Sequence, residues 1–161
     1  MKVKIFTTGG TIDKVYFDQK SEYQVGDPQA GGVLEKANVV VDYEVESILK
    51  KDSLDLTDAD RELIRSKVES TSLEKIIIIH GTDTMIKTAQ VLESVSDKTI
   101  VMTGSMYPAQ FKDSDAVFNL GSAITSVQIL KPGVYIAMNG RIFTPGNARK
   151  NIKLNRFEET E

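Results

Sequence analysis

Apolar and polar positions along the chain predict alternating strands and helices. At residues 75–79 a lysine is followed by four consecutive isoleucines. A strand with one face in water would alternate apolar and polar residues, so this run indicates a strand covered on both faces, as in a parallel sheet. From residue 85 to residue 95 apolar residues recur every three or four positions, as in an amphipathic helix. Residues 75–95 therefore predict a central strand, a tight turn and a helix.

The segment before this strand predicts a helix with a defined start. Thr57 and Asp60 have the spacing of a capping box, in which two side chains satisfy backbone N–H groups at a helix N-terminus. The apolar stripe of this helix is predicted to consist of Ala59, Leu63, Ile64 and Val68. We therefore expect a helix that leads directly into the isoleucine strand.

The same alternation extends over most of the chain. Further strands are predicted at residues 2–6, 39–45, 98–102 and 134–138. Further helices are predicted at residues 32–37 and 116–127. Strand and helix units of about thirty residues call for right-handed crossovers and parallel strands. The predicted fold is α/β: a doubly wound, mainly parallel sheet in three layers, flavodoxin-like or Rossmann-like, in a single domain over residues 1–161.

Two segments fall outside this alternation. Residues 13–26 are polar and aromatic, include Tyr16 and Tyr23, and have no helical period. They predict either an ordered hairpin or a mobile flap that closes over a site at the sheet edge. From about residue 147 the chain becomes a basic, polar tail. In such a tail Lys150 can be an ordinary solvated lysine.

Composition narrows the classes of function. With 161 residues, 40% of them hydrophobic, the chain is long enough for one proper core. The net charge is -3 and no basic block is present, so nucleic acid is not an expected partner. The chain has no cysteine and one histidine, so we expect no disulfide, no thiol catalysis and no metal site. No cofactor is expected. No apolar run approaches membrane-spanning length, and we expect a soluble, cytoplasmic protein without membrane contact.

Hydroxyl groups collect where the predicted strands end. Thr11 follows two glycines after the first strand, and Thr82 and Asp83 follow Gly81 after the isoleucine strand. The carboxyl ends of parallel strands meet at one sheet edge, where open α/β sheets bind ligands. Such a hydroxyl-rich edge favours acyl chemistry, although a Thr-Asp pair at a helix start is also a common cap. The residues alone leave both interpretations open.

Two motifs add a resemblance to a known family. Thr-Gly-Gly-Thr-Ile at residues 8–12 and His-Gly-Thr-Asp-Thr-Met at residues 80–85 resemble, in the same order, the two signatures of the bacterial-type asparaginase and glutaminase family. The resemblance continues at residues 20–26, 52–57, 102–108 and 117–120 and spans nearly the whole chain.

This resemblance implies an amide hydrolase that forms a covalent acyl-threonine. Thr11 would be the nucleophile, with Tyr23 of the flap beside it. Lys150 would keep Thr82 or a water deprotonated, and Asp83 would polarise Lys150. The substrate-binding residues implied by the resemblance are Gly10, Ser53, Leu54, Gly81, Thr82, Asp83 and Ser105. His80 is expected to hold its loop by hydrogen bonds and is not expected to take part in the chemistry.

Two departures from the family pattern affect the expected substrate and assembly. Family members have a smaller C-terminal domain, which supplies an acid to a neighbouring site, and the present chain stops where its linker would begin. Leu54 stands where larger members have a glutamine that contacts the substrate amino group. We therefore expect a homo-oligomer, weak binding of asparagine, and turnover of a carboxamide without the α-amino group. The alternatives are a binding or regulatory module that retains the pocket, or a flavodoxin-like nucleotide or flavin binder, for which no phosphate loop is present.

Overall fold

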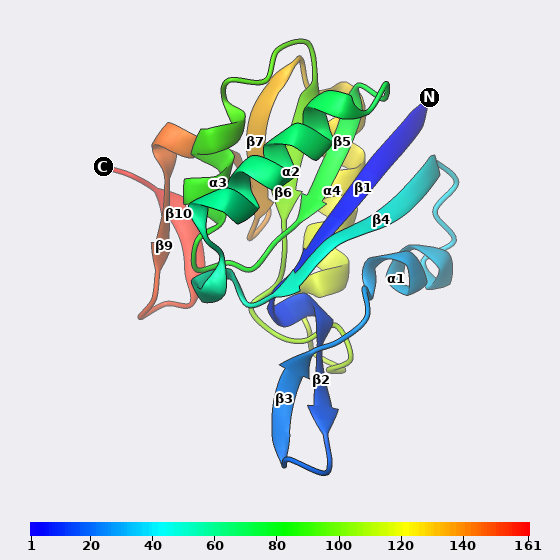
Figure 1. Ribbon diagram of the computed structural model, residues 1–161, viewed down its shortest axis with the longest axis vertical. Helices are drawn as coiled ribbons and strands as arrows, with labels where there is room; N and C mark the ends of the chain where they lie inside the picture. The colour runs from blue at the N-terminus through cyan, green and yellow to red at the C-terminus, as the bar shows by residue number, and fades with distance from the viewer.

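The computed structural model describes residues 1–161 and has a six-stranded sheet at its centre (Figure 1). Its strands lie in the order β4-β1-β5-β6-β7-β8, and all neighbours are parallel except the antiparallel pair β7 and β8. The bounds are β1 (Lys2–Gly9), β4 (Asp42–Lys51), β5 (Lys75–Ile79), β6 (Thr99–Thr103), β7 (Gly133–Met138) and β8 (Arg141–Phe143). The mainly parallel α/β class predicted from the sequence is confirmed.

The strand order reverses its direction of winding at one defined place. From β1 the chain crosses to β4 on one side, and later returns to β5 on the other side of β1. Taken along the chain, the parallel strands have the order 2-1-3-4-5, which is the flavodoxin-like arrangement. In such sheets ligands bind beyond the carboxyl ends of the strands where the winding changes direction. Here that point lies between β1 and β5, whose ends carry the two threonine motifs.

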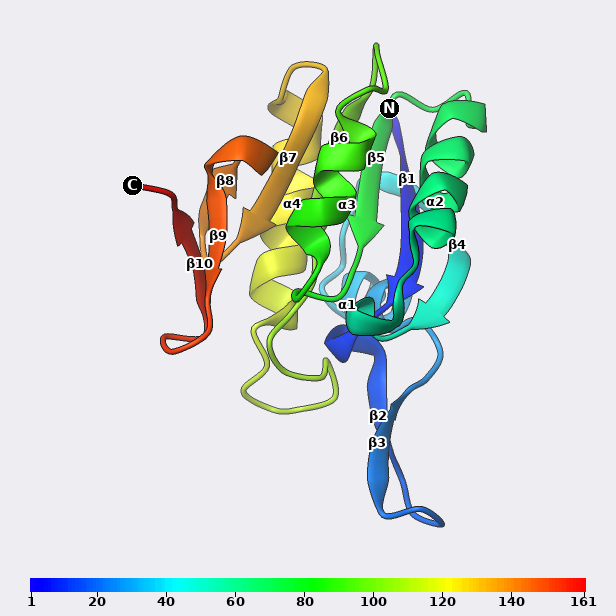
Figure 2. The same cartoon turned by 60° about the vertical axis from the view of Figure 1, so that its left-hand side comes forward.

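Helices cover both faces of the sheet (Figures 1 and 2). α2 (Asp58–Ser70) and α3 (Met85–Leu92) lie on one face, and α1 (Ala30–Lys36) and α4 (Ala116–Ile129) on the other. Ile76 and Ile78 belong to the core under α2 and α3, whereas Ile77 and Ile79 belong to the core under α1 and α4. All four are 0% exposed, and burial stabilises each side chain by about 2 kcal/mol. The unbroken run is therefore explained by a strand with two buried faces.

α2 begins where the sequence predicted. Thr57 Oγ1 accepts a hydrogen bond from Asp60 N at 3.1 Å, and Asp60 Oδ2 accepts one from Thr57 N at 2.9 Å, which completes the capping box. The predicted apolar stripe is only half right: Ile64 and Val68 are buried, but Ala59 and Leu63 face solvent. Arg61 is 2% exposed and takes the inward position instead. Arg61, Ile64 and Val68 share one face of the helix: Ile64 and Val68 enter the core, and the Arg61 guanidinium is accommodated beside them by a hydrogen bond from its Nη1 to Leu56 O at 3.1 Å.

Two predicted boundaries are corrected. The strand expected at residues 39–45 is β4, which begins at Asp42 and continues to Lys51. Val40 precedes it and is 98% exposed. Pairing with β1 over Asp42–Ser47, and again at Lys51 after an irregularity in the register, extends β4 beyond the predicted strand. The helix expected at residues 32–37 begins two residues earlier, at Ala30.

The predicted polar tail is an ordered hairpin. After the short helix η3 (Pro145–Asn147), β9 (Ala148–Asn151) pairs antiparallel with β10 (Arg156–Glu159). Ala148 is 7% exposed and Phe157 is 3% exposed, and both belong to the core beneath α2 and α3. Two buried side chains within a polar segment fix the hairpin against the body.

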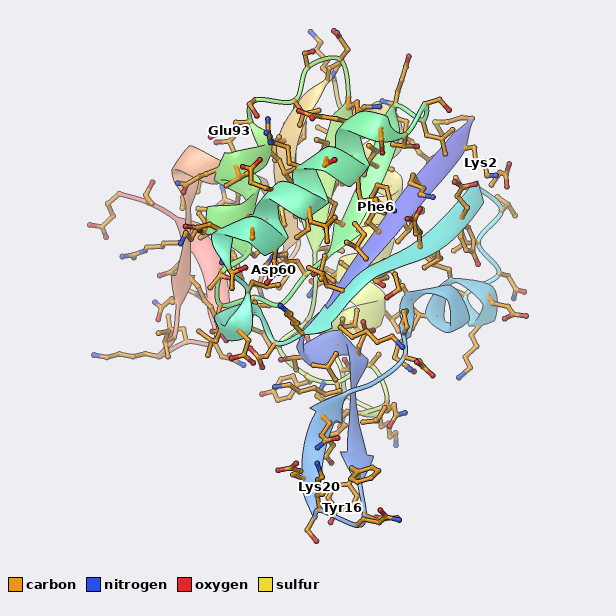
Figure 3. The ribbon with its side chains drawn as sticks, viewed as in Figure 1. Lys2, Phe6, Tyr16, Lys20, Asp60 and Glu93 are labelled. Carbon is orange, nitrogen blue, oxygen red and sulfur yellow. The ribbon has the colours of Figure 1, made fainter.

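A second hairpin projects from the molecule at the carboxyl end of β1 (Figures 1 and 2). β2 (Lys14–Phe17) pairs antiparallel with β3 (Glu22–Val25) and with no other strand. Tyr16 and Lys20 lie at its far end (Figure 3). The hairpin predicted for residues 13–26 is therefore present. None of the helices, of which α4 with 14 residues is the longest, has the length and apolarity needed to cross a membrane.

Candidate active site

Three strand-end loops are packed together by glycines. A Cβ atom on Gly10 would lie 2.5 Å from Gly81 Cα, and a Cβ atom on Gly81 would lie 2.6 Å from Ser53 Cβ. Real Cβ atoms do not approach so closely, so no larger residue fits either position without movement of a loop. Gly10 also has φ of 91°, a conformation that favours glycine. The loops after β1, β5 and β4 are thereby held in direct contact.

Thr11 begins the short helix η1 (Thr11–Asp13) directly after this contact and is partly exposed. Backbone hydrogen bonds hold the turn: Asp13 N donates to Gly10 O at 3.2 Å, and Ala109 N donates to Ile12 O at 3.0 Å. Tyr23 lies on β3 of the projecting hairpin and is 48% exposed. No hydrogen bond joins the side chains of Tyr23 and Thr11. The turn is thus rigidly supported, and the hairpin carries Tyr23 from a separate element.

Lys150 joins the second threonine motif. Its Nζ donates hydrogen bonds to Thr82 Oγ1 at 2.8 Å and to Asp83 Oδ1 at 2.6 Å. Thr82 is 6% exposed, and the side chains of Lys150 and Asp83 are 17% and 42% exposed. Such a part-exposed ion pair adds little stability, so its value lies in the orientation of the three groups. The sequence suggested these three residues as one group, and the structure brings them together.

The position of Lys150 follows from the ordered hairpin. Lys150 pairs with Phe157 across β9 and β10. Phe157 is buried, and its backbone N donates to Asn139 Oδ1 at 2.8 Å, beyond the end of β7. The lysine therefore reaches the β5 loop, 68 residues away along the chain from Thr82, on a fixed element.

Ser53 presents a buried hydroxyl beside the glycine contact. The residue is 1% exposed, and its Oγ has no hydrogen-bond partner within the chain. Its carbonyl oxygen accepts a hydrogen bond from Thr84 Oγ1 at 2.8 Å, which ties this loop to the second threonine motif. Buried hydroxyls without partners are uncommon, and one at a strand-end loop is available to a ligand.

The two neighbours of Ser53 in the chain, Asp52 and Leu54, are more exposed than Ser53, and Asp52 carries a charge. Leu54 is 71% exposed, and its backbone N donates to Asp52 Oδ1 at 3.1 Å. Burial alone would raise the pKa of Asp52. The bond from Leu54, the ion pair with Lys14 at 3.0 Å and the charge of Lys150 together lower the pKa below its ordinary value. The edge of the site beside Leu54 therefore combines an apolar side chain with an ionised carboxylate.

Ser105 and His80 are engaged in holding loops. Ser105 Oγ donates to Tyr107 O at 2.5 Å within its own loop. His80 is fully buried; its Nδ1 lies 2.7 Å from Gly81 O and its Nε2 lies 2.8 Å from Thr88 Oγ1. Burial lowers the pKa of His80 to about 4, against the opposing effect of its bond to Gly81 O. The imidazole is therefore neutral at pH 7, and both ring nitrogens stabilise the loop that carries Thr82.

Sequence reasoning missed Asp13. It is 1% exposed, and burial raises its pKa to about 6, although the bond from Gln29 N to its Oδ1 at 2.9 Å and the charge of Lys50 oppose the rise. Its carbonyl oxygen accepts a hydrogen bond from Gly26 N at 2.8 Å. Asp13 therefore fastens the hairpin at its base, two residues from Thr11. The only signal was a carboxylate next to the threonine turn, and the sequence did not indicate its burial.

The site is open in the isolated chain. The protein has four cavities, and neither threonine lines any of them. Nor do three or more potential metal-ligating side chains gather in one place. The exposed and part-exposed groups of the site, Thr11, Leu54, Asp83 and Lys150, therefore lie at the sheet edge outside any cavity, and Ser53, Thr82 and His80 lie buried behind them.

Comparison with known proteins identifies the family of this chain. The family model described as "Asparaginase, N-terminal" matches residues 2–158. A glutaminase-asparaginase of Acinetobacter glutaminasificans is 36% identical over 114 residues, which is 68% of this chain and 33% of that protein. The solved structure of the thermostable L-asparaginase from Thermococcus kodakarensis has a TM-score of 0.85 and 29% identity, and the match covers 99% of this chain and 51% of that one.

A third relative is matched over a similar share of both chains. The probable cytoplasmic L-asparaginase from Campylobacter jejuni has a TM-score of 0.83 at 26% identity, with 98% of this chain and 52% of that chain covered. The chain thus spans from a third to about half of the length of these relatives. On the match over residues 2–158 and the shared fold, the chain belongs to the asparaginase family, to whose N-terminal domain it corresponds.

Proposed function

We propose that this chain carries the catalytic threonines of an amidohydrolase that hydrolyses a small carboxamide, asparagine or a related amide, and releases ammonia. One observation carries the proposal: Lys150 Nζ bonds to both Thr82 Oγ1 and Asp83 Oδ1. The contact of Gly10 with Gly81 keeps this group beside the Thr11 turn. A nucleophile, proton-transfer groups and backbone N–H donors are the components that acyl transfer needs.

In the proposed reaction the Thr11 hydroxyl oxygen bonds to the amide carbon. The C–N bond then breaks, and the proton lost by Thr11 leaves with the nitrogen as ammonia. Tyr23, carried by the hairpin, would act beside the nucleophile, and Thr82 with Lys150 would carry the proton. Water next attacks the acyl-threonine ester, which regenerates the hydroxyl and releases the acid. Thr82 and Lys150 would activate this water in the same way.

Substrate binding is proposed for the loops around the glycine contact. The unpartnered Ser53 hydroxyl would donate to a substrate carboxylate, and Asp83 would pair with a substrate ammonium where one is present. Leu54, 71% exposed, offers an apolar wall in place of an amide. The complete proposed set comprises Gly10, Ser53, Leu54, Gly81, Thr82, Asp83 and Ser105.

Assembly and location belong to the same proposal. The threonines line no cavity, which supports a homo-oligomer in which a partner subunit shields the sheet edge and excludes water from it. A cytoplasmic location is supported by the description of the Campylobacter jejuni relative as a probable cytoplasmic enzyme.

The test is ammonia release from asparagine, glutamine and simple carboxamides. Thr11→Ala, Thr82→Val and Lys150→Met should each abolish release, while the melting temperature stays almost unchanged. Thr125→Ala and Lys153→Met remove an exposed threonine and an exposed lysine and should retain wild-type rates. Mass spectrometry of the quenched reaction should detect an acyl group on Thr11. Retained turnover in Thr11→Ala or Thr82→Val would refute the assignment.

A further inference from the structure

The projecting hairpin depends on contacts with the body. β2 and β3 pair with each other only, and an isolated two-stranded hairpin is marginally stable in water. At its base, Gly26 N and Gln29 N bond to Asp13. Lys14, the first residue of β2, also forms an ion pair with Asp52 at 3.0 Å. These contacts hold the base of the hairpin only, so a contact further along it is needed to fix the position of Tyr23.

Phe111 provides that contact. The ring centroids of Tyr23 and Phe111 are 5.6 Å apart with an interplanar angle of 68°, an edge-to-face arrangement. On its other side Tyr23 packs against Tyr16, with a centroid distance of 5.4 Å, inside the hairpin. Phe111 is the only residue of the body in aromatic contact with the hairpin. The Tyr23 ring is therefore held between its own hairpin and a residue outside it.

The loop that carries Phe111 is braced. The carboxylate of Asp115 accepts hydrogen bonds from Met106 N at 2.9 Å and from Tyr107 N at 3.1 Å. Asn119 Nδ2, one turn further along α4, donates to Asp115 Oδ2 at 2.9 Å and to Gly104 O at 3.0 Å. Both ends of the loop are thus tied to the start of α4, and Figures 1 and 2 show this loop at the same end of the molecule as the hairpin.

This loop also contacts the nucleophile turn. Ala109 N donates to Ile12 O at 3.0 Å, next to Thr11. Phe111 follows two residues later, and its N donates to Pro108 O at 3.0 Å. Phe111 is 41% exposed and belongs to neither core cluster, so packing of the core does not account for a large aromatic residue here. One loop therefore links the Thr11 turn to the ring of Tyr23.

We propose that Phe111 is a positioning residue: it holds the Tyr23 ring, and with it the hairpin, against the body, in the arrangement from which the Tyr23 hydroxyl acts on Thr11 in the proposed reaction. The inference rests on the proposed function, because that function gives Tyr23 its place in the reaction. An aromatic pair of this geometry favours the docked hairpin by a factor of about 2 to 10. The effect on turnover should have the same size.

Two measurements test the proposal on the full chain. Hydrogen exchange of the backbone amides at residues 14–25, without substrate, should be about 2 to 10 times faster in Phe111→Ala than in wild type. Phe111→Tyr keeps the ring and should restore wild-type exchange. Phe118→Ala removes an aromatic residue of α4 that is 62% exposed, and should leave the hairpin unchanged. Unchanged exchange in Phe111→Ala overturns the proposal.

Kinetics separate positioning from general stability. Phe111→Ala should lower kcat by about 2- to 10-fold, with an unchanged melting temperature, and should have no further effect in a Tyr23→Phe background. An equal loss in both backgrounds would mean that Phe111 does not act through the Tyr23 hydroxyl, and would overturn the proposal. A wild-type chain that releases no ammonia would refute the proposed function, whereas the exchange experiment alone decides whether Phe111 holds the hairpin.

Discussion

Asp13→Asn should change how the stability of this protein depends on pH. In the folded chain burial raises the pKa of this carboxyl from its ordinary 3.8 to about 6. Between these two pH values the unfolded chain has released the proton and the folded chain still holds it. The folded state binds more protons there, so the Asp13 contribution makes the free energy of unfolding fall as pH rises from 3.8 to about 6.

The size of the effect follows from the pKa difference. Since one pKa unit corresponds to about 1.4 kcal/mol, ionised Asp13 costs the folded state about 3 kcal/mol above pH 6. Asparagine resembles the protonated carboxyl, and its side-chain oxygen can still accept the bond from Gln29 N. Asp13→Asn should therefore match wild type near pH 4 and be more stable by up to about 3 kcal/mol at pH 7.

Urea unfolding at a series of pH values from 4 to 7 measures this difference directly. Taking the variant minus wild type at each pH cancels the contributions of all other titrating groups, His80 included. Asp18→Asn removes an exposed carboxylate from the same hairpin and controls for the loss of one negative charge. Parallel pH profiles for Asp13→Asn and wild type would show that the carboxyl is not perturbed by burial, and would refute the reasoning.

Four further predictions follow from other contacts. In the Asp13→Asn background, stability should rise by about 3 kcal/mol from pH 4 to 6.5, because the unfolded chain protonates His80 there and the folded chain does not; the same urea series measures this. Gly81→Ala should lower the melting temperature, at a cost of about 1–3 kcal/mol, since its Cβ would lie 2.6 Å from Ser53 Cβ. Wild type should hydrolyse a succinamic-acid-like amide at least as well as asparagine, and Leu54→Gln should shift the kcat/KM ratio towards asparagine; efficient hydrolysis of asparagine with rejection of the deaminated amide would contradict this. Light scattering at micromolar concentration should find an oligomer, and a strictly monomeric species would count against the proposed shielding.

The local patterns of apolar and polar residues were sufficient to predict the α/β class and the mainly parallel sheet. Four isoleucines in a row predict a strand with two buried faces. The structure confirms this prediction at Ile76–Ile79, within β5. The capping box at Thr57 predicted the start of α2 because its two hydrogen bonds are local. The buried face of α2 was not predictable in the same way. Arg61 faces inward in place of Leu63, on the same face as the core residues Ile64 and Val68, and its guanidinium donates to Leu56 O; the apolar pattern of the helix alone did not predict this.

The candidate site, too, could be predicted from the sequence only in part. By itself the sequence determined where the candidate residues Thr11, Thr82 and Asp83 stand, in short motifs at predicted strand ends. The resemblance grouped Lys150 with them, but only the tertiary structure decided how Lys150 reaches Thr82, because this depends on Phe157, whose burial anchors a hairpin that was predicted as a polar tail.

Asp13 and Phe111 show most clearly what the sequence alone could not predict. The burial of Asp13 and the contact of Phe111 with Tyr23 join segments that are far apart in the chain or separated by turns. Local periodicity describes a residue's own element, whereas the pKa of a carboxyl and the position of a ring depend on what other elements bring next to them. The sequence therefore determined the strands, most helix starts and the motifs that hold the candidate side chains, and the packing of distant segments decided how those side chains are oriented and charged.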